Sequence, residues 1–387
     1  MRVTQLNDDV LRSLSDVEAD EPVVVSVFIN LDPSQFATAA ARESQVNSLL
    51  SLLRERMRDG ELSDDAQEAL EVDRERLERF LREDLDVSGA EALACYSSHA
   101  LDVFEAIKLS DPVESDVRID LRPILEPVIG QEDDGDWCVL LVTRDSGRIF
   151  RGGPTGIREI ADVHSDVKNQ HQAGGWSQAR FERSVDQEVE WHLEAVTDRL
   201  FRHFKRRPFE HLVIGANNES LRPALTGEAH SYLLERVRGW IDLDEEAASE
   251  EDVFEAARAV MERHLAAMEQ ELFERLRAEQ GTDGRAATDL DGVLAALVEQ
   301  RVETLMVKDS AQAEGTKCVT CGWIGAAGRK RCPLDETVLD EVDNIVEPAI
   351  QAAIQQAADV HVIRPAIVAD ERVPAPFDGP VAAVLRY

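Results

Sequence analysis

The sequence has 387 residues, of which 43% are hydrophobic and 31% are charged. This length predicts two or three domains, and the composition excludes a disordered or fibrous chain. The 77 acidic residues outnumber the 42 basic ones and give a net charge of −35, which argues against a general nucleic-acid coat or a binder of anionic membranes. Six of the basic residues are Lys; this bias fits a high-salt cytoplasm and Arg-biased codon usage equally well.

Cysteine usage and hydropathy indicate the cellular compartment in which the protein is expected. Five cysteines in a chain of this length do not form a disulfide framework. The first twenty residues contain no apolar segment of the signal-peptide type, and no apolar run is long enough to cross a membrane. We therefore expect a soluble, cytoplasmic protein that does not engage a membrane.

Residues 1–130 are predicted to form an α/β domain. A strand-like run from Val23 to Leu31 is followed by an amphipathic helix that ends at Gly60. Ser63 is predicted to cap a charged helix that reaches about residue 85. Three further strands are expected over residues 90–96, 101–107 and 117–121.

Residues 131–280 are predicted to form a second domain, after an acidic linker at 131–136. Strands at 137–143, 148–150 and 157–163 form a predicted antiparallel meander. A polar loop from Ser165 to Ser177 leads into a long helix, whose apolar residues recur every three or four positions until Pro208. A short buried strand is expected at 211–215, and a Ser249/Asp252 capping box starts a helix that reaches about residue 278.

Residues 285–387 are predicted to form a third α/β unit. Helices are expected over 290–298 and 342–357, and strands over 302–307, 360–363 and 381–385. A cysteine-containing insertion occupies 316–340. The predicted fold class is therefore α/β multidomain.

The loop before the long helix carries the segment Gly174-Gly-Trp-Ser-Gln-Ala-Arg-Phe181. Ser177 suits a helix N-cap, and Trp176 can pack on Phe181 as a hydrophobic staple. That structural interpretation leaves the length of the preceding polar loop unexplained, and long loops on rigid scaffolds often carry function.

This segment resembles the signature of bacterial and archaeal relatives of the archaeal–eukaryotic class-1 peptide chain release factors. The Vms-type peptidyl-tRNA hydrolases of ribosome quality control are similar and use Gly-Ser-Gln where release factors use Gly-Gly-Gln. Residues 26–38 (SVFINLDPSQFAT) resemble the N-terminal domain of the bacterial and archaeal group. Residues 291–307 and the terminal PVAAVLRY resemble the third domain of release factors and Pelota.

The resemblance implies a ribonuclease H-like middle domain, a release-factor-type α/β/α third domain, and an activity on peptidyl-tRNA at the ribosome. By position, Gln178 matches the family glutamine and Ser177 its neighbour, whereas Trp176 separates Gly174 and Gly175 from this pair. A glutamine amide does not titrate, but it can orient a water that attacks the ester between peptide and tRNA. Flanking glycines let backbone N–H groups approach the developing charge.

Local charge agrees with RNA contact by the middle domain. The segment from Arg144 to Arg207 contains 12 basic and 10 acidic residues, so its net charge is +2 in a chain whose net charge is −35. The long helix carries the candidate RNA-binding residues, which are Arg180, Arg183, Arg202, Lys205, Arg206 and Arg207. The alternative is that the last of these complement the dipole at the helix C-terminus.

The insertion contains Cys318-x2-Cys321-x10-Cys332-x2-Asp335, which has the spacing of a small zinc ribbon. Related third domains often carry four cysteines, and Asp335 stands at the fourth position here. Zinc bound by three thiolates and Asp335 and a metal-free ribbon both remain open. Cys95 and Cys138 lie in apolar runs and are predicted to be core residues.

Three functions follow from these patterns. The first is a ribosome-associated peptidyl-tRNA hydrolase acting on stalled complexes, and the second is a non-catalytic, Pelota-like ribosome-binding adaptor, which the inserted Trp176 favours. Codon reading is not expected, because the Asn-Ile-Lys-Ser motif of release factors is absent. The third is a metal-dependent nuclease, for which the candidate strands offer Asp145, Glu159 and Asp162.

Overall fold

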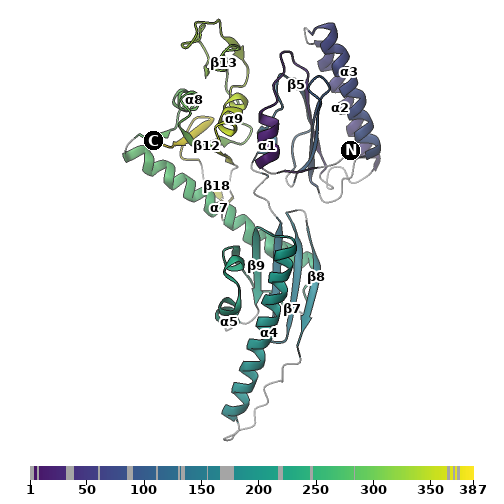
Figure 1. Cartoon of the computed structure of the whole chain (residues 1–387), viewed down its shortest axis with the longest axis vertical. Helices are drawn as coiled ribbons and strands as arrows, with labels where there is room; N and C mark the ends of the chain where they lie inside the picture. The colour runs from purple at the N-terminus through teal and green to yellow at the C-terminus, as the bar shows by residue number, and fades with distance from the viewer. Residues whose placement is uncertain are drawn as a thin grey trace. The chain divides into compact units, whose positions relative to one another are not determined.

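The computed structural model describes residues 4–6, 8–31, 39–59, 62–84, 90–109, 112–129, 131, 136–154, 156–165, 178–216, 221–244, 247–282, 284–363, 367–368, 371–372 and 375–387. Two compact units are present (Figure 1). The outer unit comprises Met1–Asp133 together with Met268–Tyr387, and the middle unit comprises Asp134–Ala267. The chain is thus a multidomain α/β protein with several sheets, as predicted.

The N-terminal half of the outer unit is a five-stranded sheet in the order β1-β4-β3-β2-β5. β1 pairs with β4 in parallel, and the other pairs are antiparallel. The strands are β1 (Thr4–Gln5), β2 (Val24–Asn30), β3 (Ala92–Ser98), β4 (Val103–Leu109) and β5 (Asp116–Asp120). The helices are α1 (Asp8–Ser15), α2 (Ala39–Asp59), α3 (Asp64–Arg79), the π-helical turn η1 (Phe80–Asp84) and the 3₁₀ turn η2 (Glu126–Val128).

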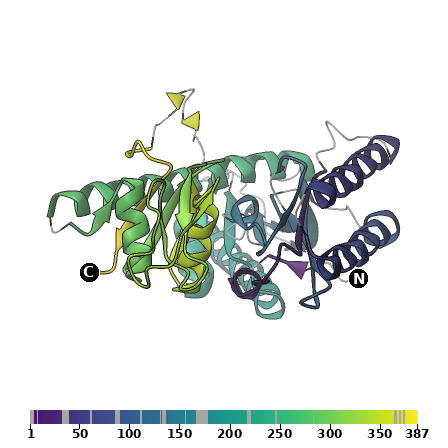
Figure 2. The ribbon, with the colours of Figure 1, turned by 90° about the horizontal axis from the view of Figure 1, so that it is seen from above.

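Alternation along β2 explains why both faces of this sheet are covered. Val25, Val27 and Ile29 pack with α2 and α3 in one hydrophobic cluster, and both helices lie along one side of the sheet (Figures 1 and 2). Phe28, on the other face, belongs to the cluster that contains α1, α8 and α9. Successive side chains of a strand point to opposite faces, so both apolar sets are buried.

The C-terminal half of the outer unit has the sheet order β11-β19-β12-β16, in which β12 and β16 are parallel. The strands are β11 (Ala286–Ala287), β12 (Val302–Lys308), β16 (Asp359–Ile363) and β19 (Val381–Leu385). Helices α8 (Leu290–Val298) and α9 (Val346–Gln355) cover one face, and residues Phe273 and Leu276 of α7 (Glu250–Thr282) pack with the other. An insertion forms the small sheet β14-β13-β15, with β13 (Gly315–Lys317), β14 (Ile324–Ala326) and β15 (Asp340–Val342). β17 (Ile367–Val368) pairs with β18 (Glu371–Arg372).

The two halves of the outer unit share one hydrophobic core. Phe28, Tyr96 and Ile107 of the first sheet belong to the same cluster as Ile350 and Ala353 of α9. A polar row on α9 completes the contact. Gln351 Nε2 donates to the carbonyl of Pro123 at 3.0 Å, and Gln355 Nε2 donates to the carbonyl of Ser15 at 2.9 Å. Segments more than 200 residues apart in sequence therefore form one folded body.

The middle unit is a five-stranded sheet in the order β10-β9-β6-β7-β8. The strands β6 (Trp137–Val142), β7 (Ser146–Gly153) and β8 (Gly156–His164) form an antiparallel meander. β9 (His211–Ala216) is parallel to β6, and β10 (Val237–Ile241) is parallel to β9. Residues of α4 (Gln178–Arg206) and α5 (Leu221–Glu228), with Leu233 of α6 (Ser231–Leu234), pack on one face. The start of α7 packs on the other face.

Most predicted elements are confirmed within a few residues. Ser63 Oγ caps α3 by accepting from Ala66 N, and Ser249 and Asp252 form the expected capping box. Cys95 and Cys138 are fully buried. One helix begins later than predicted: α9 starts at Val346, because Val342 ends strand β15 and the Asn344 side chain accepts from Val346 N.

Candidate functional site

The glutamine loop is anchored by the elements on either side of it. β8 ends at His164, and α4 begins at Gln178. The candidate residues Gly174, Gly175 and Ser177 lie outside the described residues, as do the side chains of Arg180, Arg183 and Gln178 itself. The structure therefore places Gln178 as the first residue of the long helix, which agrees with its predicted position.

Helix α4 is held to its sheet by its C-terminal two thirds. Val189, Leu193, Val196 and Leu200 are buried against the sheet, and Figure 1 shows the N-terminal part of α4 extending beyond the sheet edge. A rise of 1.5 Å per residue puts the start of the helix roughly 16 Å from Val189. The glutamine end of α4 is thus presented away from the core of the middle unit.

A buried histidine ties the start of the loop to α4. His192 is 1% exposed, and its Nδ1 atom is hydrogen-bonded to Ser165 Oγ at 2.8 Å. Ser165 is the last described residue before the loop. The same helix that carries Gln178 therefore also fixes the other end of the loop. Sequence reasoning passed over this pair because a lone His on a helix gives no such signal.

The basic C-terminus of α4 is partly engaged within the middle unit. The guanidinium of Arg207 contacts both carboxylate oxygens of Asp136, at 3.0 and 2.9 Å. Arg202 Nε donates to the carbonyl of Asp198, whereas the Lys205 ammonium lies over the Phe201 ring. Arg207 is therefore engaged by Asp136, although its side chain is exposed like those of Arg202, Lys205 and Arg206.

The carboxylates of the nuclease alternative have separate partners. Glu159 forms an ion pair with Arg148 at 2.7 Å, and Asp162 pairs with His164 at 2.9 Å. Asp145 accepts from Thr143 Oγ1. Within the described ranges, these three acids do not come together into a group that could hold a metal. The structure gives the nuclease hypothesis no support.

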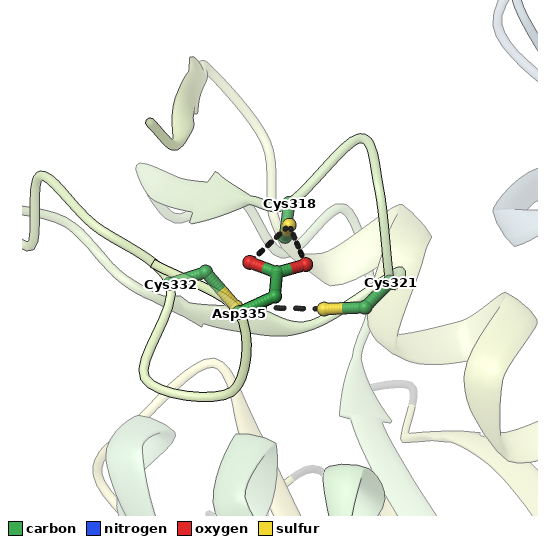
Figure 3. Close-up of side chains that lie close together, drawn as sticks. All are labelled: Cys318, Cys321, Cys332 and Asp335. Carbon is green, nitrogen blue, oxygen red and sulfur yellow. Dashed lines mark hydrogen bonds between the residues drawn. The ribbon is translucent and has the colours of Figure 1, made fainter. Parts of the chain in front are cut away.

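The four predicted metal ligands do converge. Cys318, Cys321, Cys332 and Asp335 place their ligand atoms within 4.8 Å of one another, and Figure 3 shows the side chains pointing inward. Cys318 Sγ lies 3.5 and 3.6 Å from the Asp335 oxygens, and the Sγ atoms of Cys321 and Cys332 are 3.4 Å apart.

The two turns of this cluster repeat one backbone pattern. Gly322 N donates to Cys318 O, and Cys318 N donates to Trp323 O. In the second turn, Glu336 N donates to Cys332 O in the same way, and Cys332 N donates to Thr337 O. Gly322 and Glu336 both have positive φ, at 73° and 63°. Asp335 therefore occupies in the second turn the place that Cys321 occupies in the first.

The donor set fits a tetrahedral zinc ion. Zn–S bonds of about 2.3 Å place two thiolates about 3.8 Å apart, and a thiolate and a carboxylate oxygen about 3.5 Å apart. The separations in the cluster are close to these values. Three thiolates with one carboxylate also form a chemically acceptable set for zinc.

Protonation in the cluster is uneven. Burial raises the pKa of Cys318, but backbone N–H groups of Cys321 and Thr320 outweigh it and leave that pKa lowered. The N–H of Thr337 donates to Asp335 and lowers the pKa of its carboxyl. The N–H of Trp323 favours the Cys321 thiolate, but burial and the neighbouring acids prevail and raise its pKa to about 12. A metal ion would have to displace this proton.

Comparison with known proteins agrees with the resemblance seen in the sequence. Residues 130–269 match the family model described as bacterial archaeo-eukaryotic release factor family 10. Peptide chain release factor subunit 1 from Thermococcus sibiricus is 24% identical over 264 residues, and that from Thermococcus kodakarensis is 23% identical over the same length. Each match covers 60% of this chain and 61% of the archaeal protein.

Solved structures in the same group were also matched. A crystal structure of the archaeal termination factor aRF1 aligns over 99% of each chain with 16% identity and a TM-score of 0.27. Pelota from Archaeoglobus fulgidus aligns over 76% of this chain and 79% of its own, with 14% identity and a TM-score of 0.33. No helix in the described part of the chain is long and apolar enough to cross a membrane. The family match to the middle unit and the archaeal sequence relatives together identify this chain as a relative of the archaeal–eukaryotic peptide chain release factors.

Proposed function

We propose that the protein is a ribosome-associated factor that cleaves the ester between peptide and tRNA in stalled complexes. The observation that carries this proposal is the position of Gln178. Gln178 is the first residue of a long helix inside the segment that matches the release factor family. The end of the helix that carries Gln178 extends beyond the sheet (Figure 1). A reactive loop presented in this way can enter a site on a large partner. One structure related to this chain, at 13% identity and a TM-score of 0.39, is described as ribosome-bound archaeal Pelota and ABCE1.

In this proposal Gln178 orients the attacking water and does not act as a base. Its amide can accept a hydrogen bond from the water and donate one toward the reacting carbonyl. Backbone N–H groups at Gly174, Gly175 and Ser177 would face the charge that develops on that carbonyl. The tRNA and the ribosome would supply the remaining groups.

The middle unit is proposed to be ribonuclease H-like. A three-strand meander followed by two parallel strands, with α4 and α5 on one face and α7 on the other, supports this assignment. The division into domains 1–130, 131–280 and 285–387 is likewise a proposal, in which the first and third domains pack together.

Zinc is the proposed structural cofactor of the insertion. The paired turns and the converging ligands support a zinc ribbon in which Cys318, Cys321, Cys332 and Asp335 hold the ion. Bound there, zinc would tie the two turns together and stabilise a small sheet that has little apolar core of its own.

A single-turnover release assay on ribosomes carrying labelled peptidyl-tRNA tests the activity. Gln178→Ala should slow cleavage by roughly ten- to a thousandfold, the range for losing one orienting or stabilising group. Its effect on stability should stay within about 0.5 kcal/mol, because Gln and Ala are both good helix formers. Gln187→Ala makes the same change at an exposed position of α4 and is the matched control.

The adaptor remains the second candidate function, favoured by Trp176, which interrupts the expected Gly-Gly-Gln or Gly-Ser-Gln sequence. Trp176→Ala should lose stability before it loses activity if Trp176 serves as a staple. Wild-type protein that binds ribosomes but releases no peptide would favour the adaptor instead. A Gln178→Ala variant as fast as Gln187→Ala would refute the role proposed for Gln178.

A further inference from the structure

Three aromatic rings form a column on the surface of the middle unit. The rings of Phe201 and His230 are 4.2 Å apart with planes 12° from parallel. The rings of His230 and Tyr232 are 5.0 Å apart with planes 6° from parallel. Phe201 comes from α4, whereas His230 caps α6 and Tyr232 lies within it. The column therefore joins two segments that are about thirty residues apart in sequence.

Packing explains the inner end of this column but not the outer end. Phe201 is partly buried against the core of the middle unit. Tyr232, in contrast, is 53% exposed, and His230 is also exposed. Among the described residues, the ring of Tyr232 contacts no aromatic ring besides that of His230. The Tyr232 ring thus ends the stack of three rings and is more than half exposed to solvent.

Cations surround the column. The Lys205 ammonium lies over the Phe201 ring, 4.4 Å from its centre. Arg236 lies over Phe204 and donates to the carbonyl of Tyr232 at 2.7 Å. Its own nearest carboxylate is that of Glu235, at 4.0 Å.

The local charge is positive in a strongly acidic protein. Residues 199–207 contain four arginines and one lysine and no acid. Burial and the surrounding arginines at 199, 206, 151 and 202 lower the pKa of His203, as expected where cations gather. At physiological salt, charges more than about 8 Å away are largely screened, so this patch can attract an anion despite the net charge of −35.

We propose that this column is a stacking platform for a base of single-stranded RNA. The base would continue the stack on the exposed ring of Tyr232, and Arg202, Lys205 and Arg206 would hold the neighbouring phosphates. Aromatic side chains beside a basic helix are how proteins bind unpaired nucleotides, since every base has a face that can stack. In a duplex the bases are stacked on one another, so few base faces are available to stack on Tyr232.

The proposal deepens the proposed function by naming a contact to RNA. It rests on the proposed function only for the identity of the RNA that is bound in the cell. The platform is therefore tested with the full-length protein and RNA oligonucleotides alone. Fluorescence anisotropy measures the affinity for a 12-nucleotide single strand, and 2-aminopurine in the strand reports stacking by its quenching. Failure here leaves the peptide-release assay unaffected, and failure of that assay leaves this one unaffected.

The expected result separates stacking from charge. Tyr232→Ala should weaken binding of the single strand about 5- to 150-fold, the range for losing one base–aromatic stack, and should abolish the quenching. Tyr232→Phe keeps the ring and should bind like the wild type. The control is Tyr387→Ala, because Tyr387 is also exposed, at 70%, and lies in the outer unit.

Three outcomes would overturn the proposal. Wild-type protein that binds neither the single strand nor a duplex of the same length would mean that the patch serves another partner, such as an acidic protein surface. Equal binding of the single strand by wild type and Tyr232→Ala would remove stacking. Equal binding of duplex and single strand, independent of Tyr232, would leave a phosphate contact without base recognition.

Discussion

Glu347→Gln tests the buried carboxylate that joins the two halves of the outer unit. Glu347 is 7% exposed and accepts from the backbone N–H groups of Leu125 at 2.9 Å and Glu126 at 3.1 Å. Gln351 Nε2 donates to it at 3.1 Å. Burial raises its pKa to about 7 even though these three donors favour the charged form, and the nearby Glu126 carboxylate raises it further.

The sign and size of the effect follow from this pKa. A carboxyl whose pKa is higher in the folded state than the unfolded value of 4.5 stabilises the fold fully below the unfolded pKa and loses that contribution as pH rises through 7. At 1.36 kcal/mol per pKa unit, the full contribution is about 3 kcal/mol. The sequence pI is about 4.6, and a protein with little net charge tends to precipitate. Measurements therefore begin at pH 5.5, where about 2 kcal/mol of the Glu347 contribution remains.

Thermal unfolding of both proteins between pH 5.5 and pH 8 measures this contribution. Gln at position 347 cannot titrate, and the other acids are common to both proteins, so the difference isolates this carboxyl. Relative to the variant, the wild type should lose about 2 kcal/mol over this range, or roughly 4–8 °C in the melting temperature of the outer unit. A difference that stays constant, or that favours the wild type more at pH 8, would show that the carboxylate is ionised and stabilised by its donors, and would refute the reasoning.

Four further outcomes are expected from the metal cluster and the basic helix. Protein purified without added metal or chelator should hold about one zinc per chain; a stoichiometry near zero that zinc addition does not change would contradict this. Asp335→Cys should hold zinc more tightly than the wild type in a chelator competition, whereas equal retention would place Asp335 outside the site. Replacing Arg202, Lys205 and Arg206 together by Gln should weaken RNA binding and reduce its salt slope by about 2, and an unchanged slope would indicate a purely structural cluster. Arg207→Gln should instead lower the melting temperature, because its guanidinium is already in an ion pair.

Local sequence patterns predicted the strands and the cysteine cluster, because these features depend on residues that are close together in the sequence. The apolar runs at 137–143 and 211–215 became β6 and β9, and the cysteine spacing alone identified a cluster that the fold brings together. β10 was missed, because Arg238 and Gly239 interrupt its alternation and its pairing with β9 defines it as a strand. Helix α1 was also missed.

Contacts between distant segments could not be predicted in this way. Glu347 falls inside the helix predicted over 342–357 without any signal that it is buried, and its partners Leu125 and Glu126 lie more than 200 residues earlier in the chain. The ring column likewise depends on the turn that brings His230 onto α4. Gln178 was found from its motif, and its place at the helix start agrees, but the motif alone does not describe the geometry of the loop.

The shared core of the outer unit has a consequence for synthesis on the ribosome. Phe28, Tyr96 and Ile107 pack against α9 and its neighbours, which are translated more than 200 residues later. At about 5–20 residues per second, this apolar face waits roughly 10–50 s for its partner. The middle unit is contiguous in sequence and can fold during that interval. The first sheet of a nascent chain is therefore the segment most in need of a chaperone, and a chain truncated before α9 would expose it permanently.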